Sequence, residues 1–265
     1  MTLRKESIRA AFAEAAATYD GSSSLQQEVC AELARFVRGA CAPPAAPGLI
    51  LDAGCGTGRL GRALEDEYNA CRVVSCDFAQ PMLIEARLKD CEAALVGGDM
   101  DSLPFAEETF DIVASNLAFQ WTAGGGASFK EAARVLKPGG LLAFTTLGTD
   151  TLRELRESCA EAGISASPVP FIGMDALPIL LDRAGLETVA MDRRPITREY
   201  PDMRGLIKTL RLIGAAPRIE GAGLSLATGT LLRKAGQVYL KRYPAQGNGV
   251  AATYDVIFCG ARKGI

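Results

Sequence analysis

The stretch LILDAGCGTGRL, residues 49–60, combines a short apolar run with three closely spaced glycines. The apolar run ends at Asp52, and Gly54, Gly56 and Gly58 follow before a helical pattern begins at Arg59. Glycines between a buried strand and a helix allow a tight turn and let a ligand lie against bare backbone. The triplet alone predicts a nucleoside-binding loop and leaves NAD, FAD and other nucleosides open.

The glycine spacing and the acid before it narrow the choice of ligand. The dinucleotide pattern needs a glycine or alanine three positions after its second glycine, and Arg59 stands there instead. Asp52 makes the local field negative, which disfavours a pyrophosphate and favours a cationic ligand. S-adenosylmethionine carries a sulfonium and an ammonium group and no phosphate, so it fits this loop, with S-adenosylhomocysteine as the product.

Strand and helix patterns alternate from residue 49 to the end of the chain. The predicted strands are 49–54, 71–77, 92–99, 110–116, 141–147, 186–197 and 251–263. The predicted helices between them are 59–68, 81–90, 127–136, 151–162 and 174–185, and KPGG (137–140) is expected to be a turn. This alternation predicts an α/β fold with a doubly wound, seven-stranded, mostly parallel, Rossmann-like sheet.

Two helical segments lie outside this alternation. Residues 1–47 form an N-terminal segment with helices predicted over 6–18 and 24–39, separated at YDGSSS. Residues 198–248 form an insert before the last strand, with helices predicted over 203–214 and 225–243. We expect 1–265 to be a single domain in which the insert caps the ligand side of the sheet.

Acidic residues stand at the ends of the second and third predicted strands as well as the first. Asp77 can accept hydrogen bonds from both ribose hydroxyls, and Asp99 can accept one from an adenine amino group while Met100 packs on the ring. Each acid alone also suits an exposed strand end, but three in order after this loop predict a cofactor site. The expected cofactor-binding residues are Asp52, Gly54, Cys55, Gly56, Asp77, Phe78, Met82, Asp99, Met100 and Asn116.

The composition excludes several kinds of chemistry. The 265 residues contain no histidine, which removes Ser-His-Asp and Cys-His hydrolases and H-E-x-x-H metalloproteases, and we expect no metal. None of the eight cysteines forms a C-x-x-C pair, as expected of reduced thiols in a cytoplasmic protein. We expect no signal peptide, no membrane span and, from the net charge of −2, no nucleic-acid partner.

The stretch FDIVASNLAFQW, residues 110–121, begins as a buried strand and ends in polar side chains and the only tryptophan. Asn116 is expected to emerge at the carboxyl end of the sheet, beside the sulfonium. Methylases of adenine or glutamine nitrogen commonly carry an acidic or amide residue followed by Pro-Pro-aromatic at this place. The chain has Leu117 and Ala118 there, which argues against a DNA-amine methylase.

Together with the glycine loop, SNLAFQW and EAARVLKPGGLLAFTTLGTDTLRELRES resemble the malonyl-acyl-carrier-protein O-methyltransferases, class I methyltransferases that open pimelate synthesis for biotin. The resemblance extends to AFAEAAATYD near the start, LIKTLRLIGAAPR in the insert and KRYPAQGNGVAATYDVIFCGARK at the end. It implies methyl transfer to the free carboxylate of a malonyl thioester. That carboxylate is ionised at neutral pH and needs no general base, in agreement with the missing histidines.

Substrate-side roles are expected for a second set of residues. The resemblance favours Tyr19 as a hydroxyl lid over cofactor and substrate, although a core tyrosine at a helix end is the alternative. An arginine can bind the malonyl carboxylate bidentately. The candidates, each of which also suits a solvated helix face, are Arg156, Arg153, Arg211 and Lys208. Gln120 and Trp121 are expected to line the acyl pocket, although Trp121 also suits simple packing.

Charge is unevenly spread, with 13 Lys and Arg against 20 Asp and Glu in residues 1–150, and 16 against 11 in residues 151–265. The asymmetry is either ordinary scatter or a sign that the second half meets an acidic partner. The basic residues of the insert include Lys208, Arg211, Arg218, Arg233, Lys234, Lys241 and Arg242. Because acyl carrier proteins are acidic, we expect the insert to dock a malonyl carrier protein, with malonyl-coenzyme A as the other candidate thioester.

Other functions remain open at the level of the sequence. On the same scaffold, these are a carboxyl methyltransferase for a small acid such as aconitate and a quinone-type C-methyltransferase. A carbon acid needs a base, which this chain offers only as a carboxylate or a tyrosine. Outside enzymes, the alternative is a catalytically silent S-adenosylmethionine-binding protein.

Overall fold

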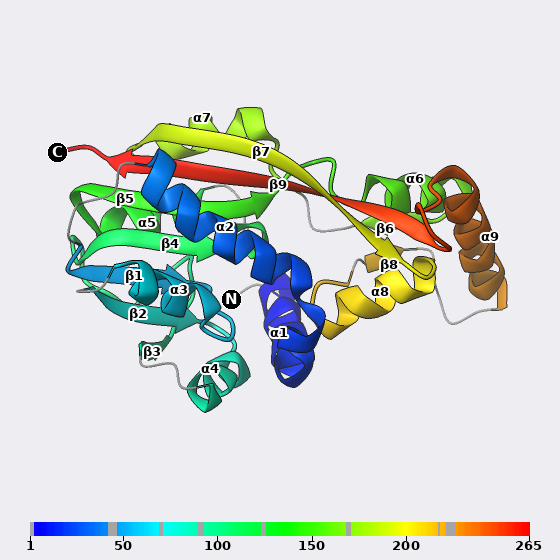
Figure 1. The fold of residues 1–265 in the computed structure, drawn as a ribbon, viewed down its shortest axis with the longest axis horizontal. Helices are drawn as coiled ribbons and strands as arrows, with labels where there is room; N and C mark the ends of the chain where they lie inside the picture. The colour runs from blue at the N-terminus through cyan, green and yellow to red at the C-terminus, as the bar shows by residue number, and fades with distance from the viewer. Residues whose placement is uncertain are drawn as a thin grey trace.

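The computed structural model describes residues 3–41, 47–68, 71–89, 93–122, 126–167, 171–216, 218–220 and 226–265. Its centre is a seven-stranded sheet with the order β3-β2-β1-β4-β5-β9-β7 (Figure 1). The strands are β1 (Leu49–Ala53), β2 (Arg72–Asp77), β3 (Ala94–Gly97), β4 (Phe110–Asn116), β5 (Leu136–Leu147), β7 (Leu186–Tyr200) and β9 (Val250–Lys263). β9 pairs antiparallel with β5 and β7, and the other strand pairs of this sheet are parallel, so the predicted doubly wound, mostly parallel sheet is confirmed.

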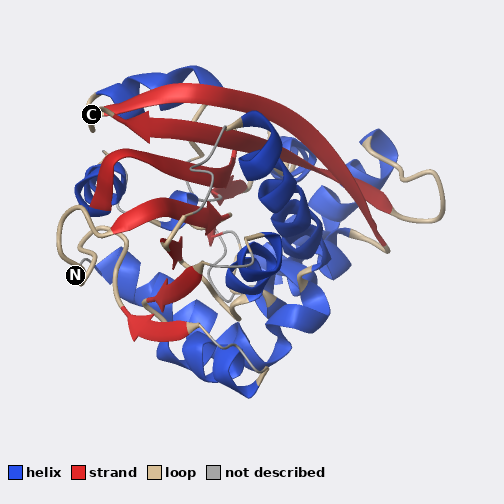
Figure 2. Cartoon of the chain, turned by 60° about the vertical axis from the view of Figure 1, so that its left-hand side comes forward, coloured by secondary structure: helices blue, strands red, loops and turns tan. Residues whose placement is uncertain are grey.

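Apolar side chains cover both faces of the sheet, as parallel strands with helices on each side require. In β4, Ile112 faces one core and Val113 the other, and Ile50 and Leu51 of β1 divide in the same way. The helices α2 (Ser24–Ala40) and α3 (Arg59–Glu67) close the first core, and α5 (Ala127–Val135) and α7 (Leu177–Asp182) close the second. Figure 2 shows the strands between these helical layers.

The segment KPGG is a bulge and not the predicted turn. β5 begins at Leu136, and its pairing with β4 jumps from Phe110↔Leu136 to Ile112↔Leu141. Gly139 adopts a φ of 73°, which glycine takes up without steric cost. The strand therefore runs through both sides of a bulge, which periodicity alone does not distinguish from a turn.

The ribbon formed by β7 and β9 is longer than the rest of the sheet. Its pairing runs from Leu186↔Lys263 to Tyr200↔Val250, whereas β5 follows β9 only as far as Val256. The part beyond β5 carries the insert, with α8 (Met203–Leu212) and α9 (Leu226–Arg242), at one end of the molecule (Figure 1). Both insert helices thus lie where the sequence predicts them.

The insert is fastened to the ribbon and to α6 (Arg153–Glu161), against which α9 packs. The buried Tyr239 of α9 donates its hydroxyl to the carbonyl oxygen of Ala251 in β9 at 2.9 Å. Two further strands, β6 (Ser165–Ser167) and β8 (Arg218–Glu220), pair as a small antiparallel sheet that the sequence does not predict.

The N-terminal helix α1 (Leu3–Ser22) packs against α4 (Gln80–Leu88) and against α8 (Figure 1). Only Ser23 separates α1 from α2, so α1 continues through most of the predicted break. Thr18 Oγ1 donates to the carbonyl oxygen of Leu212 at 3.0 Å. A side chain at Gly214 would meet the carbonyl oxygen of Ala11 at 3.1 Å. α1 therefore connects α4, which packs on β2 and β3, to the insert.

In the described part of the chain, no helix combines the length and apolar character needed to cross a membrane. Over the same residues, no group of three or more Cys, Asp or Glu side chains is arranged to hold a metal ion. The seven described cysteines are free thiols, and Cys91 lies outside the described residues.

Candidate active site

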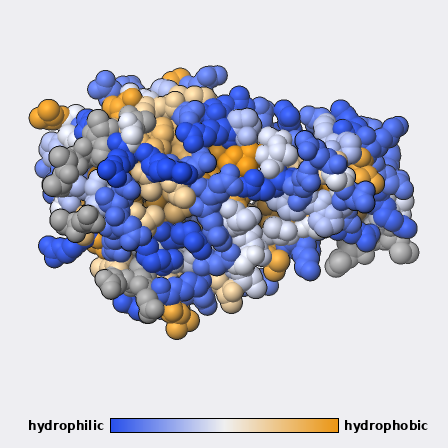
Figure 3. All heavy atoms as spheres, viewed as in Figure 1, coloured by the Kyte–Doolittle hydropathy of each residue, from blue (hydrophilic) through white to orange (hydrophobic). Residues whose placement is uncertain are grey.

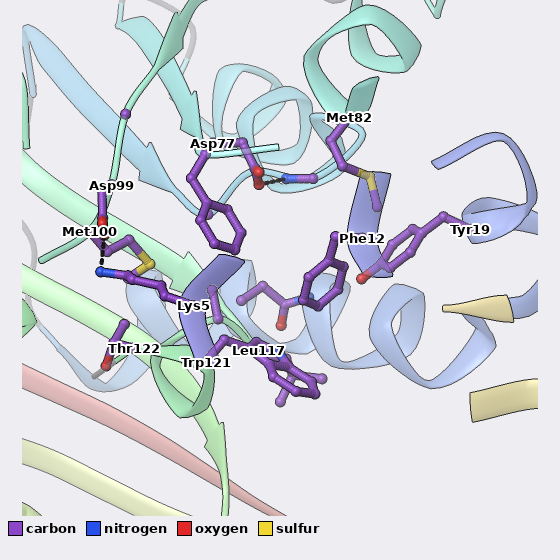
Figure 4. Close-up of a pocket in the computed structure, with 16 residues that line it drawn as sticks. Lys5, Phe12, Tyr19, Asp77, Met82, Asp99, Met100, Leu117, Trp121 and Thr122 are labelled. Carbon is purple, nitrogen blue, oxygen red and sulfur yellow. Dashed lines mark hydrogen bonds and ion pairs between the residues drawn. The ribbon is translucent and has the colours of Figure 1, made fainter. Parts of the chain in front are cut away.

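Two adjoining hollows lie at the carboxyl ends of β1, β2 and β4. The first, which we name the main cavity, has a volume of about 600 Å³ that includes its open mouth (Figure 4). It is lined by Lys5, Phe12, Tyr19, Gly54, Gly56, Asp77, Phe78, Met82, Gly98, Asp99, Met100, Asn116, Leu117, Ala118, Trp121 and Thr122. The second, which we name the loop cavity, has a volume of about 390 Å³ and lies between the glycine loop and the α1–α2 junction. Tyr19, Gly54, Gly56 and Asn116 line both.

The glycine loop is held by its position between two strand ends. The amides of Gly54 and Cys55 both donate to the carbonyl oxygen of Cys76, at 2.8 and 3.0 Å. Gly54 has a φ of 72°, and a Cβ there would lie 2.5 Å from the Cβ of Ala118, so no other residue fits. Gly56 has a φ of 53° with nothing within 4 Å of the same position, which leaves its backbone open to a ligand.

Asp52 carries an unpartnered oxygen in the wall of the loop cavity. Its Oδ2 accepts a hydrogen bond from the amide of Gly61 at 2.9 Å, while Oδ1 has no partner among the described residues. The side chain is 1% exposed, and this burial raises the pKa of Asp52 to about 7, with the nearby charge of Asp77 adding to the rise. A buried carboxylate in this state gains from a cationic or hydrogen-bond-donating ligand.

Asp77 joins the glycine loop to the start of α4. Its Oδ2 accepts from the amide of Gly56 at 2.9 Å and its Oδ1 from the amide of Ala79 at 2.8 Å. Burial raises the pKa of Asp77, although these hydrogen bonds oppose the rise. A carboxylate has about four acceptor sites, so about two remain for ligand hydroxyls.

Asp99 has a cationic partner that sequence reasoning missed. Lys5 Nζ of α1 lies 2.5 Å from Asp99 Oδ1 and 2.5 Å from Asp101 Oδ2, and Lys5 itself is buried (Figure 4). Burial alone lowers the pKa of Lys5, but the bonds to Asp101 and Asp99 outweigh burial and leave the pKa raised. The first turns of α1 are therefore tied to the third strand-end acid.

α1 directs one face into the main cavity. Lys5, Phe12 and Tyr19 recur at intervals of seven residues, which places them on one side of a helix. Figure 4 shows all three around the cavity, with the ring of Phe12 edge-on to that of Trp121 at 5.2 Å between centroids. Burial raises the pKa of the Tyr19 phenol, and the charges of Asp77 and Asp20 add to this. This spacing was the signal by which Lys5 and Phe12 could have been found once Tyr19 was placed.

The polar residues that end β4 are each tied to a neighbouring element. Ser115 Oγ donates to the carbonyl oxygen of Ala53 at 2.7 Å. Asn116 Oδ1 accepts from Thr145 Oγ1 at 2.8 Å, and its Nδ2 donates to the carbonyl oxygen of Gln26 in α2 at 3.0 Å. Asn116 therefore fixes the N-terminal helices to the end of the sheet as well as lining both cavities.

Gln120 lies outside the lining of both cavities. Leu117 has a φ of 50°, which is strained for a residue with a side chain, and its amide donates to Thr145 Oγ1 at 2.9 Å. Gln120 Nε2 donates to the carbonyl oxygen of Leu117 at 2.7 Å, and Gln120 Oε1 accepts from Thr146 Oγ1 at 3.2 Å. The buried Gln120 thus braces the turn that carries Leu117 into the main cavity.

The proposed carboxylate-binding cations are not gathered at the main cavity. Arg156 donates through Nη2 to the carbonyl oxygen of Thr149 at 2.7 Å and through Nη1 to that of Thr151. Arg153 pairs with Glu154, while Lys208 and Arg211 are exposed on α8. Of the side chains whose placement is described, Lys5 is the one cation that lines the main cavity.

The structure brings most of the expected cofactor-binding residues together. Those that line the main cavity are Gly54, Gly56, Asp77, Phe78, Met82, Asp99, Met100 and Asn116, joined there by Tyr19 and Trp121. Asp52 and Cys55 line the loop cavity. Lining residues that sequence reasoning missed include Lys5, Phe12 and Thr122 in the main cavity and Asp20 in the loop cavity, where Asp20 accepts from Thr57 Oγ1 at 2.7 Å.

Comparisons with known proteins identify a methyltransferase domain and its relatives. A family model described as a methyltransferase domain matches residues 51–144. The malonyl-[acyl-carrier protein] O-methyltransferase of Gallionella capsiferriformans is 36% identical, over 98% of this chain and 91% of its own. The protein of the same name from Dechloromonas aromatica is 33% identical, over 98% and 95%.

Solved structures share the fold at low identity. The YcgJ protein of Bacillus subtilis has a TM-score of 0.60 at 15% identity, with 88% of this chain and 99% of that chain covered. Phosphoethanolamine N-methyltransferase 2 of Haemonchus contortus, solved with S-adenosyl-L-methionine, has a TM-score of 0.54 at 18% identity, over 88% and 53%. At these identities, the likeness establishes the fold alone.

Proposed function

The chain belongs to the malonyl-[acyl-carrier protein] O-methyltransferase family, and from this and its site we propose that it methylates the free carboxylate of a malonyl thioester. The methyl donor is S-adenosylmethionine and the product is the malonyl methyl ester. The family resemblance implies that this ester opens pimeloyl synthesis for biotin.

The residues of the site fit S-adenosylmethionine. The observation that carries this assignment is Asp52, which lines the loop cavity and whose buried Oδ1 has no partner among the described residues. A ligand with an ammonium group supplies the missing charge and hydrogen bonds. Asp77 retains acceptor sites for ribose hydroxyls, and Phe78, Met82 and Met100 offer apolar surface for a purine. When bound, S-adenosylmethionine supplies a methyl group on a positively charged sulfur.

The protein's part in the reaction is to position and to exclude water. The malonyl carboxylate is ionised at neutral pH, so no side chain has to remove a proton from it. Phe12, Leu117 and Trp121 give the main cavity apolar walls beside Asn116. Bringing a carboxylate and a sulfonium together in such surroundings cancels their charges during transfer, so a dry cavity favours the transition state.

Tyr19 is the side chain best placed to orient the substrate carboxylate. It lines both cavities, and because its pKa is raised it keeps its proton at neutral pH and can donate a hydrogen bond. The second hydrogen of Asn116 Nδ2 is a further donor, since its described bond to Gln26 uses one. We therefore assign the contact to Tyr19 and Asn116 rather than to an arginine.

Arg156 and Gln120 hold segments of backbone in place and do not contact the substrate. Arg156 holds the loop after β5 by its bonds to Thr149 and Thr151, and Gln120 holds the strained Leu117. Gln120 is a positioning residue for the wall of the main cavity at Leu117, and Arg156 is a positioning residue for the loop after β5. Their replacement is expected to lower the turnover rate more than the affinity for S-adenosylmethionine.

The acceptor is a thioester carried by an acyl carrier protein, as the names of the relatives indicate for those proteins. Malonyl-coenzyme A presents the same acyl group and the same arm without the protein. The two thioesters therefore separate recognition of the arm from recognition of the carrier. We place the reaction in the cytoplasm and expect no nucleic acid, membrane or metal to take part.

The test is incubation with S-adenosylmethionine and, in separate arms, malonyl carrier protein, malonyl-coenzyme A and free malonate, followed by mass spectrometry of the acyl group. We expect a mass increase of one methylene on the carrier thioester. No methyl ester on either thioester would overturn the proposal. Transfer to free malonate alone would indicate a small-acid methyltransferase, and cofactor binding without any transfer would indicate a silent binding protein.

A further inference from the structure

Helix α8 has one buried face and one exposed face. Met203, Leu206 and Leu210 are buried against the rest of the molecule. Arg204, Lys208 and Arg211 are exposed, and their spacing of four and three residues sets them in one row. Within the residues that the structure describes, no carboxylate pairs with any of these three cations. We name this row the α8 stripe.

A further hollow of about 430 Å³ lies under α8, between the start of α2 and the β7–β9 ribbon, and we name it the α8 hollow. It is lined by Ser22, Ser24, Leu25, Gln26, Arg198, Glu199, Tyr200, Thr209, Ile213 and Tyr254. No role in cofactor binding accounts for it.

The α8 hollow offers hydroxyl and amide groups with little uncompensated charge. The hydroxyls of Tyr200 and Tyr254 lie 2.8 Å apart, and Tyr254 is 5% exposed. Arg198 forms an ion pair with Glu28 of α2, and Glu199 accepts from the backbone amide of Gln246 at 3.1 Å. A neutral ligand with amide and hydroxyl groups suits this lining better than an anion does.

The hollow and the loop cavity lie on either side of one residue of α2. Gln26 lines both the α8 hollow and the loop cavity, and its carbonyl oxygen accepts the hydrogen bond from Asn116 Nδ2. Thr209 and Ile213 extend the wall of the hollow to α8, whose other side carries the stripe. A ligand that docks on the stripe and enters the hollow therefore lies one residue of α2, Gln26, away from the cavity that Asn116 lines.

We propose that the α8 stripe docks the acidic face of an acyl carrier protein and that the α8 hollow receives its pantetheine arm. This inference rests on the proposed function. The arm is an uncharged chain of two amides with a hydroxyl and two methyl groups, which matches the hydroxyls of Tyr200 and Tyr254 and the apolar wall of Leu25 and Ile213. Figure 3 shows hydrophilic side chains over much of this face of the molecule, including the end where α9 lies. The three exposed cations of the α8 stripe supply the positive charge that an acidic carrier protein complements.

The stripe is tested by reversing charges on α8 and, as a matched control, on α9. Lys208→Glu with Arg211→Glu is compared with Arg233→Glu with Lys234→Glu, since all four side chains are exposed. We expect the α8 variant to raise the KM for malonyl carrier protein about tenfold or more at low salt, and to weaken binding of a fluorescently labelled carrier by a similar factor. The KM for malonyl-pantetheine, which lacks the carrier, is expected to stay unchanged.

The hollow is tested by filling it. Thr209→Phe adds a ring, whereas Thr209→Ala removes a hydroxyl whose described bond is to its own helix, at Gly205. We expect the phenylalanine variant to raise the KM for both malonyl carrier protein and malonyl-pantetheine, with S-adenosylmethionine binding and melting temperature unchanged. The alanine variant, which does not fill the hollow, is expected to raise both KM values far less.

The outcomes separate this inference from the proposed function. If wild type esterifies the thioesters but the α8 and α9 variants bind the carrier equally, the docking face is wrong. If Thr209→Phe leaves both KM values unchanged, the hollow is not the route of the arm. Failure of wild type to form any ester overturns the proposed function itself.

Discussion

The buried carboxyl of Asp52 makes the stability of the ligand-free protein depend on pH in a predictable direction. Its pKa of about 7 in the folded state lies above the ordinary carboxyl value of 3.8, because burial disfavours the charge. The folded state therefore binds this proton more tightly than the unfolded state, and the free energy of unfolding falls as pH rises from about 4 to about 7. At 1.36 kcal/mol per pH unit, the full difference corresponds to about 4 kcal/mol.

Asp52→Asn isolates this contribution. The amide oxygen of Asn can accept from Gly61, while its NH₂ group occupies the place of the unpartnered Oδ1. Urea unfolding at several pH values gives the free energy of unfolding of each protein. Because the other titrating groups are the same in both proteins, their contributions cancel in the difference. We expect the variant to gain on wild type between pH 4 and pH 7.5 by about 4 kcal/mol and the difference to level off above that range.

S-adenosylmethionine is expected to offset the free-energy cost of ionising the buried Asp52 carboxyl. A cationic group beside Asp52 lowers the pKa of its carboxyl, so binding near pH 6 releases a proton. Calorimetry in two buffers of different ionisation enthalpy measures that proton directly, and Asp52→Asn is expected to bind more weakly and release none. A stability difference between the two proteins that does not vary with pH, or binding without proton release, would refute the reasoning.

Three other substitutions test separate parts of the site. Gly54→Ala is expected to lower the free energy of unfolding, measured with urea, by more than Gly56→Ala does. Both substitutions cost about 1–2 kcal/mol because the φ angle is positive, but only the new Cβ at residue 54 meets a neighbour, the Cβ of Ala118 at 2.5 Å. Equal losses would show that this close approach is unimportant. Lys5→Met is expected to destabilise the protein by about 2 kcal/mol, because it removes two charge-assisted hydrogen bonds to the partly buried Asp99 and Asp101. An unchanged urea midpoint would mean that α1 is held elsewhere. Tyr19→Phe is expected to lower kcat about tenfold with little change in the affinity for S-adenosylmethionine by calorimetry; full activity would remove its hydroxyl from the reaction.

The placement of the expected cofactor-binding residues around one pair of cavities could be predicted because its determinants are local. A strand, a glycine loop and a helix follow one another at residues 49–60, and parallel strands bring Asp77 and Asp99 to the same edge of the sheet. Asn116 follows from the same rule, since β4 neighbours β1.

The substrate side could not be predicted to the same depth because its contacts join distant parts of the chain. Lys5 and Asp99 form an ion pair although they are 94 residues apart in the sequence. From the sequence alone, a single lysine near the start of a helix is expected to be exposed to solvent. Arg156 offers a free guanidinium in the sequence, whereas the structure binds it to carbonyl oxygens of the preceding loop. Gln120 likewise looks like a ligand for substrate until the strained Leu117 that it supports is seen.

The central claim is that the transferred methyl group ends on a carboxylate oxygen of a malonyl thioester. Single-turnover transfer from S-adenosylmethionine with a radiolabelled methyl group, followed by mild alkaline hydrolysis, tests this directly because methyl esters release methanol. We predict that the label leaves the acyl group as volatile methanol. Label that stays on the acyl chain after hydrolysis, as a carbon-bound methyl would, contradicts the account.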